Sequence, residues 1–556
     1  MRGRLLRRFV TAAAVAVLVS LPSAARAAPT TPVVLGALPH AEASDRPGGG
    51  FLRVTFSPDG DGRGDRVVIR VRSTPGDRLQ LDVRRLSSTV DIDAGVQNVR
   101  SPVATLAWNG LDADGMRQPS GSYVIRACSA VTGRCAATRV LAHLRTLTVF
   151  TPRVAAVSVG ETIPAVIASD RVGPYMLDLV PASAPRGPGA GETLVAGPGR
   201  TGFRIPSVAG GLQLLRVRSG DDVTYFPLVV HEAQLPLGKP PRATALVVYP
   251  YLTWRAYDRS DLDRDGRIDS WYTHPRQPVV PLTGPFESLR REPGLASREA
   301  GAGSGRAFAV WMQEHDLTAQ HVTDIELGRM PPAVLRRYAT IVFPGHTEYY
   351  ERATYDRLLA YRDSGGRLYF LQANSFYGEV AVGRSRVTRL SYRYRLPTRS
   401  DFRLAANGYR SCCWPRSITP RYHLAPGIRE RLPWLFKGTD MKAHDAFGVA
   451  LTEVDAVDPR LSPPGTITIA SAVVPRFANQ GEVHAFGWLG TQPFAHEPGP
   501  IHPRRVDIAY AATGRGEVFS WGNNGFMESL YLARLPAAER GALSRIALNV
   551  WLRFTR

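Results

Sequence analysis

Three polar side chains follow two apolar segments of the sequence and are suited to hydrolytic or metal chemistry. His346 and Glu348 come after the β-branched segment Thr340 to Phe343, which Pro-Gly interrupts, and Asn374 follows the segment Arg367 to Leu371. Both segments are typical of buried strands. Because ligands bind beyond the carboxyl ends of strands in open α/β sheets, we expect the three side chains to meet at one edge.

An imidazole, a carboxylate and a carboxamide at one edge would bring together a proton carrier, a metal ligand and a hydrogen-bonding group. The set predicts a hydrolytic or metal site. The alternative is that His346 and Glu348 are loop residues paired with nearby arginines, because polar clusters also occur in ordinary structural networks.

A helix must join the two strands if their carboxyl ends are to meet. The intervening segment places Tyr355, Leu358 and Leu359 on one helical face and ends at Gly365-Gly366, a helix stop signal. Strand, helix and strand in this order predict a parallel β-α-β unit.

The same alternation continues through residues 242–556 and predicts an α/β domain with a mainly parallel sheet. Its other elements are expected as strands at Ala245 to Tyr249 and Glu517 to Trp521, and as helices at Phe308 to Glu314 and Leu543 to Phe554. A less periodic insertion from about Ser400 to Gly448, rich in arginine, proline and aromatic residues, is expected to form a lid or rim.

Two β-rich regions precede this domain, and a chain of 556 residues is expected to be multidomain. Residues 51–150 and 151–235 contain short strand-like runs separated by turn signals, which predicts two all-β, immunoglobulin-like sandwiches. Residues 28–50 are rich in Pro, Ala and Gly and are expected to be a linker.

The N-terminus has the three parts of a secretory signal peptide. Four arginines precede the apolar stretch Phe9 to Leu21, and Ala-Arg-Ala at 25–27 is a cleavage site. Removal of residues 1–27 predicts a secreted, extracellular or cell-envelope-associated protein. An uncleaved anchor is the alternative, but the stretch is short for a stable membrane span.

The formal net charge of +21 comes almost entirely from arginines that are scattered along the chain. Without a basic cluster or a recognisable motif, we expect no nucleic-acid partner. Contact with an anionic polymer of the cell envelope and formation of a homo-oligomer stay open.

Four cysteines are compatible with disulfides in a secreted protein. Cys128 and Cys135 flank a turn between two strand-like runs, so we expect a disulfide that closes a hairpin. Cys412 and Cys413 are adjacent, and either a vicinal disulfide or two thiols fits them. None of the four has the spacing of a zinc site.

Two resemblances add to these patterns. Phe56 to Asp65 and Trp108 to Gly115 resemble the immunoglobulin-like domain of flagellar hook-capping proteins, which implies a spacer module. The C-terminal region resembles the large (beta) subunit of N,N-dimethylformamidase. The pieces that carry this second resemblance are Thr253 to Tyr257, Thr323-Asp324, Gly345 to Tyr350 and Leu371 to Tyr377.

The second resemblance covers about Thr151 to the C-terminus and implies a β-sandwich before a glutamine-amidotransferase-like α/β domain. It also implies hydrolysis of a C–N bond in a small linear amide substrate. The family's characterised member acts together with a small partner subunit, which this chain does not contain.

The resemblance further implies a mononuclear Fe³⁺ centre held by two tyrosines and a glutamate. Glu348 corresponds to the glutamate and Tyr257 to the first tyrosine, while Tyr272 is the candidate for the second. His346 and Asn374 match the histidine and asparagine that line the family's site, and would serve catalysis by moving a proton and stabilising an oxyanion. Phenolate and carboxylate oxygens are hard ligands that suit ferric iron.

An acidic insertion separates the two tyrosines and departs from the family's pattern. Its aspartates follow the first part of an EF-hand Ca²⁺ loop; they are Asp261, Asp263, Asp265 and Asp269. Tyr272 stands at the end of that pattern, so the residue has two competing interpretations, as an iron ligand or as the end of a Ca²⁺ loop.

Three functions therefore stay open. The first is a secreted, iron-dependent hydrolase of amides, and the second is a non-catalytic envelope or surface protein with a silent α/β domain. The third is a histidine and carboxylate centre around His346 and Glu348 that binds non-haem iron or zinc. It would be completed by His274, His484 or His496.

Overall fold

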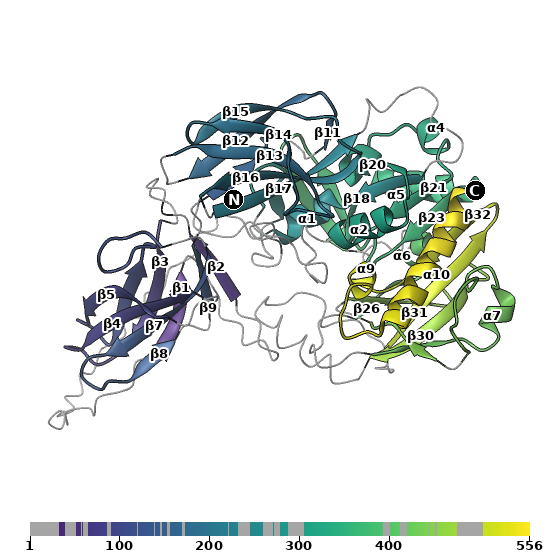
Figure 1. Cartoon of the computed structure of the whole chain (residues 1–556). Coiled ribbons are helices and arrows are strands. Elements are labelled where there is room, and N and C mark those ends of the chain that lie inside the picture. Colours follow the sequence, from purple (N-terminus) through teal and green to yellow (C-terminus); the bar gives the residue numbers. More distant parts are fainter. Residues whose placement is uncertain are drawn as a thin grey trace, which may run out of the picture.

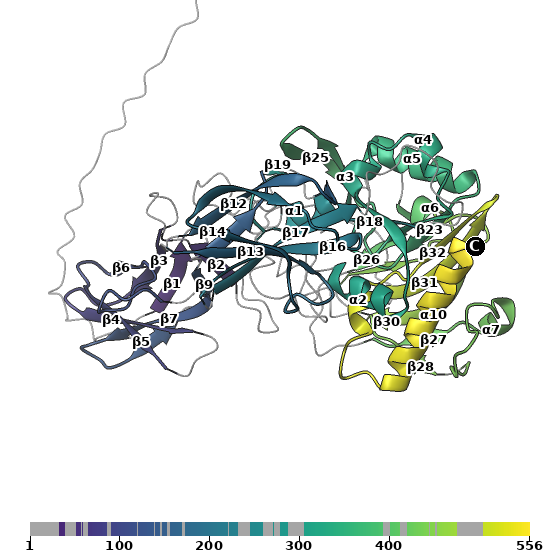
Figure 2. The same cartoon turned by 45° about the horizontal axis from the view of Figure 1, so that its top comes forward.

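The computed structural model of the chain is elongated, with the first β domain at one end and the C-terminal helix at the other (Figures 1 and 2). The described residues are 33–38, 52–56, 58, 65–85, 90–118, 121–137, 140–144, 147–152, 156–169, 173–220, 222–231, 245–258, 271, 278–286, 305–392, 401–411, 420–443, 445–450, 453–474 and 504–556.

The first domain is a β-sandwich whose sheets have the orders β1-β3-β6 and β2-β9-β7-β4-β5, with β8 beside β7. Trp108 lies in its core, 5.3 Å from the ring of Phe56 and 4.9 Å from the ring of Tyr123. The strands are β1 (Val33–Leu38), β2 (Leu52–Phe56), β3 (Val67–Arg72), β4 (Arg78–Arg85), β5 (Ile92–Asn98), β6 (Val103–Trp108), β7 (Gly121–Ser129), β8 (Cys135–Ala137) and β9 (Val140–Leu144).

Strand β1 corrects the expectation that residues 28–50 form only a linker. Its sequence Val-Val-Leu-Gly-Ala-Leu pairs with β3 in antiparallel register, from Val33 opposite Arg72 to Leu38 opposite Val68. The six residues supply ladder hydrogen bonds to an open edge of the sheet, which outweighs the turn-forming composition around them.

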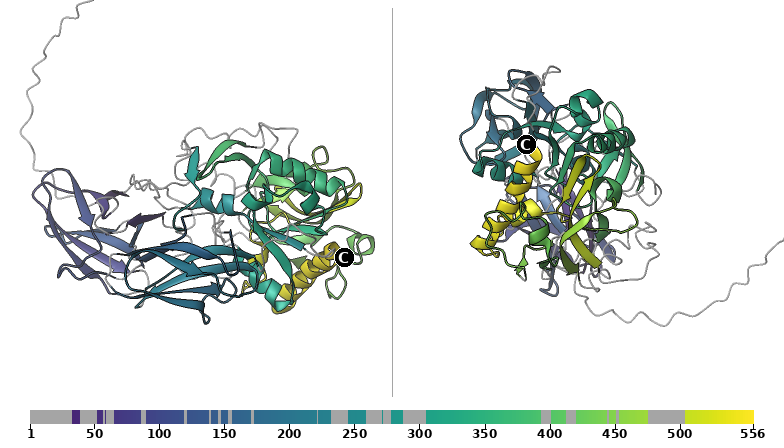
Figure 3. Two further views of the ribbon diagram at one scale, coloured as in Figure 1. Left: turned by 90° about the horizontal axis from the view of Figure 1, so that it is seen from above. Right: turned by 90° about the vertical axis from the view of Figure 1, so that its right-hand side faces the viewer.

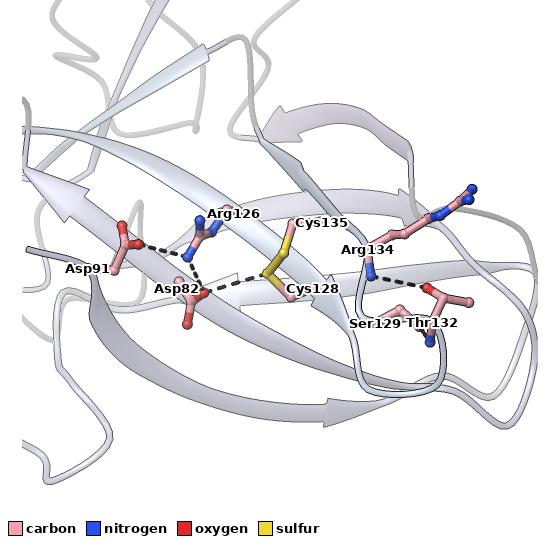
Figure 4. Close-up of a disulfide and its surroundings, with 8 residues drawn as sticks. All are labelled: Asp82, Asp91, Arg126, Cys128, Ser129, Thr132, Arg134 and Cys135. Atoms are coloured by element: carbon pink, nitrogen blue, oxygen red, sulfur yellow. Dashed lines mark hydrogen bonds and ion pairs between the residues drawn. A yellow bond between two sulfur atoms is a disulfide. The ribbon is translucent and has the colours of Figure 1, made fainter.

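The predicted hairpin disulfide is confirmed. Cys128 on β7 and Cys135 on β8 are directly opposite each other and joined by a disulfide (Figure 4). Beside it, Arg126 contacts the carboxylates of Asp82 at 3.0 Å and Asp91 at 2.7 Å. The positions of Cys412 and Cys413 lie outside the described residues.

The second domain is also a sandwich, with sheets β10-β12-β15 and β11-β17-β16-β13-β14. Its strands are β10 (Leu147–Phe150), β11 (Ala156–Ser158), β12 (Thr162–Ser169), β13 (Tyr175–Pro181), β14 (Ala190–Val195), β15 (Gly199–Arg204), β16 (Gly211–Ser219) and β17 (Asp222–His231). Inside it, the buried carboxylate of Asp178 contacts Arg216 at 2.6 Å and Arg218 at 2.9 Å, so the charge is paired.

The third domain is built on a nine-stranded sheet of order β20-β18-β21-β23-β32-β31-β30-β27-β28. Its strands are β18 (Ala245–Tyr249), β20 (Ala319–Thr323), β21 (Thr340–Phe343), β23 (Arg367–Phe370), β27 (Tyr422–Leu424), β28 (Ala446–Phe447), β30 (Ile467–Val474), β31 (Arg504–Thr513) and β32 (Gly516–Ser520). Smaller sheets contain β19 (Val279–Pro281), β22 (Tyr349–Glu351), β24 (Gly378–Val382) and β25 (Arg386–Tyr392), and also β26 (Gly408–Ser411) with β29 (Val454–Ala456).

Helices cover both faces of the large sheet because its central strands are apolar on both sides. Val247, Val342 and Tyr369 belong to the same core as α10, whereas Leu246, Ile341 and Phe370 belong to the core of α5. The helices are α1 (Tyr251–Tyr257), α2 (Arg306–Glu314), α3 (Asp324–Leu327), α4 (Pro332–Leu335), α5 (Arg352–Asp363), α6 (Asp401–Ala405), α7 (Ile428–Arg431), α9 (Phe526–Ser529) and α10 (Ala537–Thr555). Figure 3 shows α10 lying along this sheet.

The prediction of a mainly parallel, glutamine-amidotransferase-like sheet is not supported, whereas the β-α-β unit of β21, α5 and β23 is confirmed. The pairs from β20 to β32 are parallel, but those from β32 to β28 are antiparallel. Most other pairs of the molecule are also antiparallel, so the protein is multidomain and mainly β. Because β31 turns tightly into β32, these strands need no crossover helix.

The insertion around 400–448, expected to form a lid or rim, contributes short strands to two sheets. Its described part adds β27 and β28 to the edge of the large sheet and pairs β26 with β29. The short strands are two to four residues long, which is too short for a clear alternating pattern in the sequence.

The second sandwich and the third domain share one buried core. His231 at the end of β17 also crosses between them. Its Nδ1 lies 2.7 Å from the carbonyl oxygen of His321, and its Nε2 lies 2.9 Å from Glu326 Oε1. Burial alone would lower the pKa of His231. The hydrogen bond to Glu326 and its charge raise it by a larger amount, so the pKa of His231 lies above its ordinary value. A protonated imidazole donates to both oxygens.

Across the described residues, no helix is long and apolar enough to cross a membrane.

The His231–Glu326 contact predicts a pH-dependent stability. Because the folded pKa of His231 is raised, the contribution of about 1–2 kcal/mol is fully present below the unfolded pKa of about 6.5. It is lost as pH rises through the folded pKa. The thermal midpoint of the wild type should therefore exceed that of His231→Gln at pH 5.5, and the gap should shrink toward pH 9. A gap independent of pH would contradict this account.

Candidate functional site

Three neighbouring parallel strands end at the same edge of the large sheet and supply the predicted site residues. Strand β18 leads into α1 with Tyr257, β21 leads into the loop with His346 and Glu348, and β23 leads to Asn374. The expectation that His346, Glu348 and Asn374 lie at one edge agrees with the structure.

Helix α1 is held at its first turn by a buried carboxylate. Asp324 Oδ2 accepts a hydrogen bond from the backbone N–H of Leu252 at 3.1 Å. Burial raises the pKa of Asp324 well above its usual range, although backbone donors that include Leu252 oppose the rise. Asp324 begins α3, where Thr323 and Glu326 form a reciprocal capping box.

Thr253 in the same helix fixes the loop that carries Glu348. Its buried Oγ1 accepts from the backbone N–H of Glu348 at 2.9 Å and of Tyr349 at 3.3 Å. The β23 loop joins on the other side, where the N–H of Phe376 donates to the carbonyl of Thr347 at 2.7 Å. Three separate segments are thus bonded through backbone groups.

His346 is buried beside Tyr257, with ring centroids 5.4 Å apart. Its Nε2 forms an ion pair with Glu453 Oε2 at 2.8 Å and lies 3.7 Å from Glu348 Oε2. Burial alone would lower the pKa of His346. The negative charges of Glu453 and Glu348 raise it by a larger amount, so the pKa of His346 lies above its ordinary value. The imidazole therefore favours its protonated form.

Glu453 is the centre of the site, and our sequence analysis missed it. Its carboxylate accepts from Tyr257 Oη at 3.3 Å, Asn374 Nδ2 at 3.4 Å and Asn524 Nδ2 at 3.1 Å. Burial raises the pKa of Glu453, whereas His346 and these donors lower it, and the net pKa is lowered. The Glu-Val-Asp alternation entering β29 was the available sequence signal.

Asp455, two residues further on, holds the backbone at Asn374. Its fully buried Oδ1 accepts from the N–H of Asn374 at 2.8 Å. Asn374 has φ of +54°, a left-handed conformation that asparagine tolerates better than most residues. The two carboxylates therefore fix both the backbone and the side chain of Asn374.

Glu528 is a further buried carboxyl group behind the loops. Gln372 Nε2 donates to the carbonyl of Pro344 at 3.2 Å and to Glu528 Oε2 at 3.4 Å. Burial raises the pKa of Glu528 to about 7, with the bond from Gln372 opposing the rise. Gln372 links this carboxyl group to the segment that precedes His346.

The other predicted ligands fall outside the described residues. These are Tyr272, the aspartates Asp261, Asp263, Asp265 and Asp269, and the histidines His274, His484 and His496. The residue before Tyr272 is Trp271, which the structure describes. Its backbone N–H donates to the carbonyl oxygen of Ala256 at 3.2 Å.

Metal-binding groups made of at least three His, Cys, Asp or Glu side chains do not occur in the described part of the chain. The histidines that would complete the alternative around His346 and Glu348 lie outside the described residues, so that alternative stays a prediction. A centre that uses tyrosine oxygens is a different donor set, and Tyr257 lies in the site.

The role of Thr253 predicts a specific loss of stability. Thr253→Val keeps the side-chain volume but leaves two buried N–H groups without their acceptor, so unfolding in urea should become easier by about 1–3 kcal/mol. Thr253→Ser keeps the hydroxyl and should lose less. Equal losses in the two variants would show that the methyl packing, rather than the hydrogen bonds, matters at this position.

Known proteins resemble this chain at two levels, as solved structures and as a sequence family. The solved structures that match include a chimeric titin tandem, with 18% identity, 33% of this chain and 95% of that chain covered, and a TM-score of 0.17. Alpha-2-macroglobulin of E. coli matches with 13% identity, 32% and 12% coverage, and a TM-score of 0.18. Four N-terminal Ig domains of Dscam1 match with 11% identity, 36% and 46% coverage, and a TM-score of 0.15.

At these TM-scores the likenesses have no bearing on the fold, and the hook-capping resemblance of the first sandwich is not confirmed. No curated protein matches. The sequence model of the family described as "N,N-dimethylformamidase beta subunit-like, C-terminal" matches residues 200–539, more than half of the chain. The protein therefore belongs to the N,N-dimethylformamidase beta subunit-like family.

Proposed function

We propose that this protein hydrolyses the C–N bond of a small amide at a mononuclear Fe³⁺ centre. The observation that carries the proposal is the convergence of Tyr257, His346 and Asn374 on the partly buried carboxylate of Glu453. Family membership supports a dimethylformamidase-like activity.

The donor set fits ferric iron. Tyr257 and Glu348 would hold the ion, because a phenolate and a carboxylate are hard oxygen ligands, and Tyr272 is proposed as the third ligand. Asn374 Oδ1 is buried and has no hydrogen-bond partner among the described residues, so a polar group bound there would satisfy it. When bound, ferric iron would polarise a carbonyl and make a water molecule more acidic.

The protein's own residues supply the proton transfers. Glu453 has a lowered pKa and is therefore ionised, so its carboxylate is able to accept a proton from water, although the lowered pKa makes it a weaker base. His346 has a raised pKa and contacts Glu453 at 2.8 Å, so it can give a proton to the departing amine. Asn524 donates to the carboxylate of Glu453 and holds it in place. Tyr257 would lose its own hydrogen bond to Glu453 when it holds the ion as a phenolate.

We also propose that the protein is exported, as the N-terminal sequence predicts. The Cys128–Cys135 disulfide supports an oxidising compartment. Binding of Ca²⁺ by the Asp261 to Asp269 insertion is a further proposal. It would be tested by measuring calcium in the purified protein before and after Asp261→Asn.

The iron site is tested by elemental analysis and an optical spectrum. We expect near-stoichiometric iron and a visible tyrosinate-to-iron charge-transfer band in the wild type, and at least a tenfold loss of both in Glu348→Ala. Glu379→Ala is the matched control, because Glu379 is a buried carboxylate that pairs with Arg352 instead of the site. It should keep its iron.

Protein that stays colourless and free of iron after expression with iron would contradict this proposal. Together with inactivity toward amides, that result would favour a non-catalytic envelope protein. Zinc in place of iron would instead favour a histidine-containing centre.

Glu453→Gln tests the proton transfer separately from metal binding. The amide keeps the size of the side chain but cannot take a proton, so kcat should fall by about 100-fold or more. Iron content should be retained. Loss of iron along with activity would show that Glu453 is a metal ligand rather than a base.

A further inference from the structure

Gln372 joins three of the segments that surround the site. Its side chain is buried, and its Nε2 donates to the carbonyl oxygen of Pro344 at 3.2 Å. Its Oε1 accepts a hydrogen bond from the backbone N–H of Gly525. One carboxamide therefore connects the loops that follow β21, β23 and β32. The site residues on these loops are His346, Asn374 and Asn524.

The orientation of this carboxamide follows from its backbone partners. A carbonyl oxygen can only accept a hydrogen bond and a backbone N–H can only donate one, so Nε2 must face Pro344 and Oε1 must face Gly525. Nε2 also donates to Glu528 Oε2 at 3.4 Å. The amino group and the oxygen of Gln372 are thus both engaged inside the protein, which gives the side chain a structural task instead of a substrate contact.

The turn that Gln372 holds is also bonded to the segment that carries Glu453. The backbone N–H of Asn524 donates to the carbonyl oxygen of Glu453 at 2.9 Å, and the N–H of Asp455 donates to the carbonyl oxygen of Gly522 at 3.0 Å. Asn524 Nδ2 donates in addition to the carboxylate of Glu453. The turn and this segment therefore form one unit, and a bond that fixes the turn also fixes Glu453.

We propose that Gln372 is a positioning residue that holds the Glu453 segment against the loop of His346. This inference rests on the proposed amide hydrolysis and adds a residue that acts through others. The quantity it controls is the separation of His346 Nε2 and Glu453 Oε2, which is 2.8 Å. A displacement of about 1 Å between groups that must react can cost about 100-fold in rate.

Glu528 makes the hold of Gln372 sensitive to pH. Burial raises the pKa of this carboxyl group to about 7, and the bond from Gln372 opposes the rise. No cation pairs with it among the described residues. A carboxylate that ionises without a cation is costly to bury, so we expect α9 and the turn before it to loosen as pH rises above the pKa.

The charged and titratable side chains of α2 and its C-terminal end, which packs against α9, have other partners. They are Arg306, Glu314 and His315, which bond to Ala182, Tyr531 and Ser544 respectively.

The first test compares the kinetics of Gln372→Leu and the wild type with N,N-dimethylformamide. We expect kcat to fall by about tenfold or more and KM to stay within about twofold. Asn549→Leu is the matched control, because Asn549 Nδ2 donates to two carbonyl oxygens away from the site, those of Leu435 and Lys437. It should keep its kcat. Equal losses of kcat in both variants would reflect general destabilisation and overturn the proposal.

Glu528→Gln tests the same contact with a milder change. Its carboxamide oxygen can accept from Gln372 but cannot ionise, so its kcat should match that of the wild type at about pH 6 and exceed it by about threefold at about pH 8.5. When Gln372→Leu is present as well, this gain should disappear. A gain that persists without Gln372, or no gain at all, would overturn the proposal.

Hydrogen exchange decides the inference without any substrate. In Gln372→Leu the backbone amides of Asn524 and Asp455, which do not bond to Gln372, should exchange at least about tenfold faster than in the wild type. Asn549→Leu should leave them unchanged. If Gln372→Leu does not fold, Gln372→Asn replaces it, since its carboxamide is one methylene too short to reach all partners.

The two measurements separate the inference from the proposed function. Unchanged exchange in the Gln372 variant overturns the inference even if amides are hydrolysed. If the wild type hydrolyses no amide, the proposed function fails, and accelerated exchange at Asn524 and Asp455 still supports the hold by Gln372.

Discussion

The partly buried carboxylate of Glu453, whose side chain is 14% exposed, is the constraint around which the site is organised. Removing a carboxylate from water is costly unless donors and positive charge replace the water. Here the replacement comes from segments far apart in sequence: Tyr257 in α1, His346 after β21, Asn374 after β23 and Asn524 after β32. Each segment must be in place for the charge to be compensated, so the fold of the third domain and the geometry of the site depend on each other.

The mixed sheet explains how these segments meet. Its parallel half sends the chain from β18, β21 and β23 over one edge and supplies the tyrosine, histidine and asparagine. The separate two-stranded sheet of β26 and β29 contacts β31 of the antiparallel half, where the Val457 N–H donates to Asp507, and it brings Glu453 and Asp455 to the same edge. A purely parallel sheet would supply the first group of residues without the carboxylates that hold them.

Local sequence patterns predicted the parallel strands and the site residues at their carboxyl ends well. The strand formed by Thr340 to Phe343 has the predicted bounds, and α5 and β23 follow where hydrophobic periodicity and the Gly-Gly signal place them. His346 and Asn374 could then be assigned to one edge, because the carboxyl ends of parallel strands share it.

Glu453 could not be found in this way. It lies 79 residues after Asn374 in the sequence, and its contact with that residue depends on how β26 and β29 pair. Strands β27 and β28, at the end of the antiparallel half, are too short to show a recognisable period in the sequence. The apolar run of β1 was overlooked because proline and glycine surround it.

The second sandwich is connected to the site through a short series of polar contacts. His231 of β17 bonds to Glu326, which caps α3 together with Thr323, and the adjacent Asp324 holds the first turn of α1. Tyr257 is the last residue of that helix. The sandwich thus sets the position of α1 relative to the large sheet.

This connection gives a physical reason for the extent of the family match. The match begins at residue 200 and so includes β16 and β17 of the sandwich. Strand β17 provides His231 and much of the core shared with the third domain. A site that needs α1 in a fixed position also needs these strands, so sandwich and sheet form one functional unit, whereas the first sandwich has its own separate core.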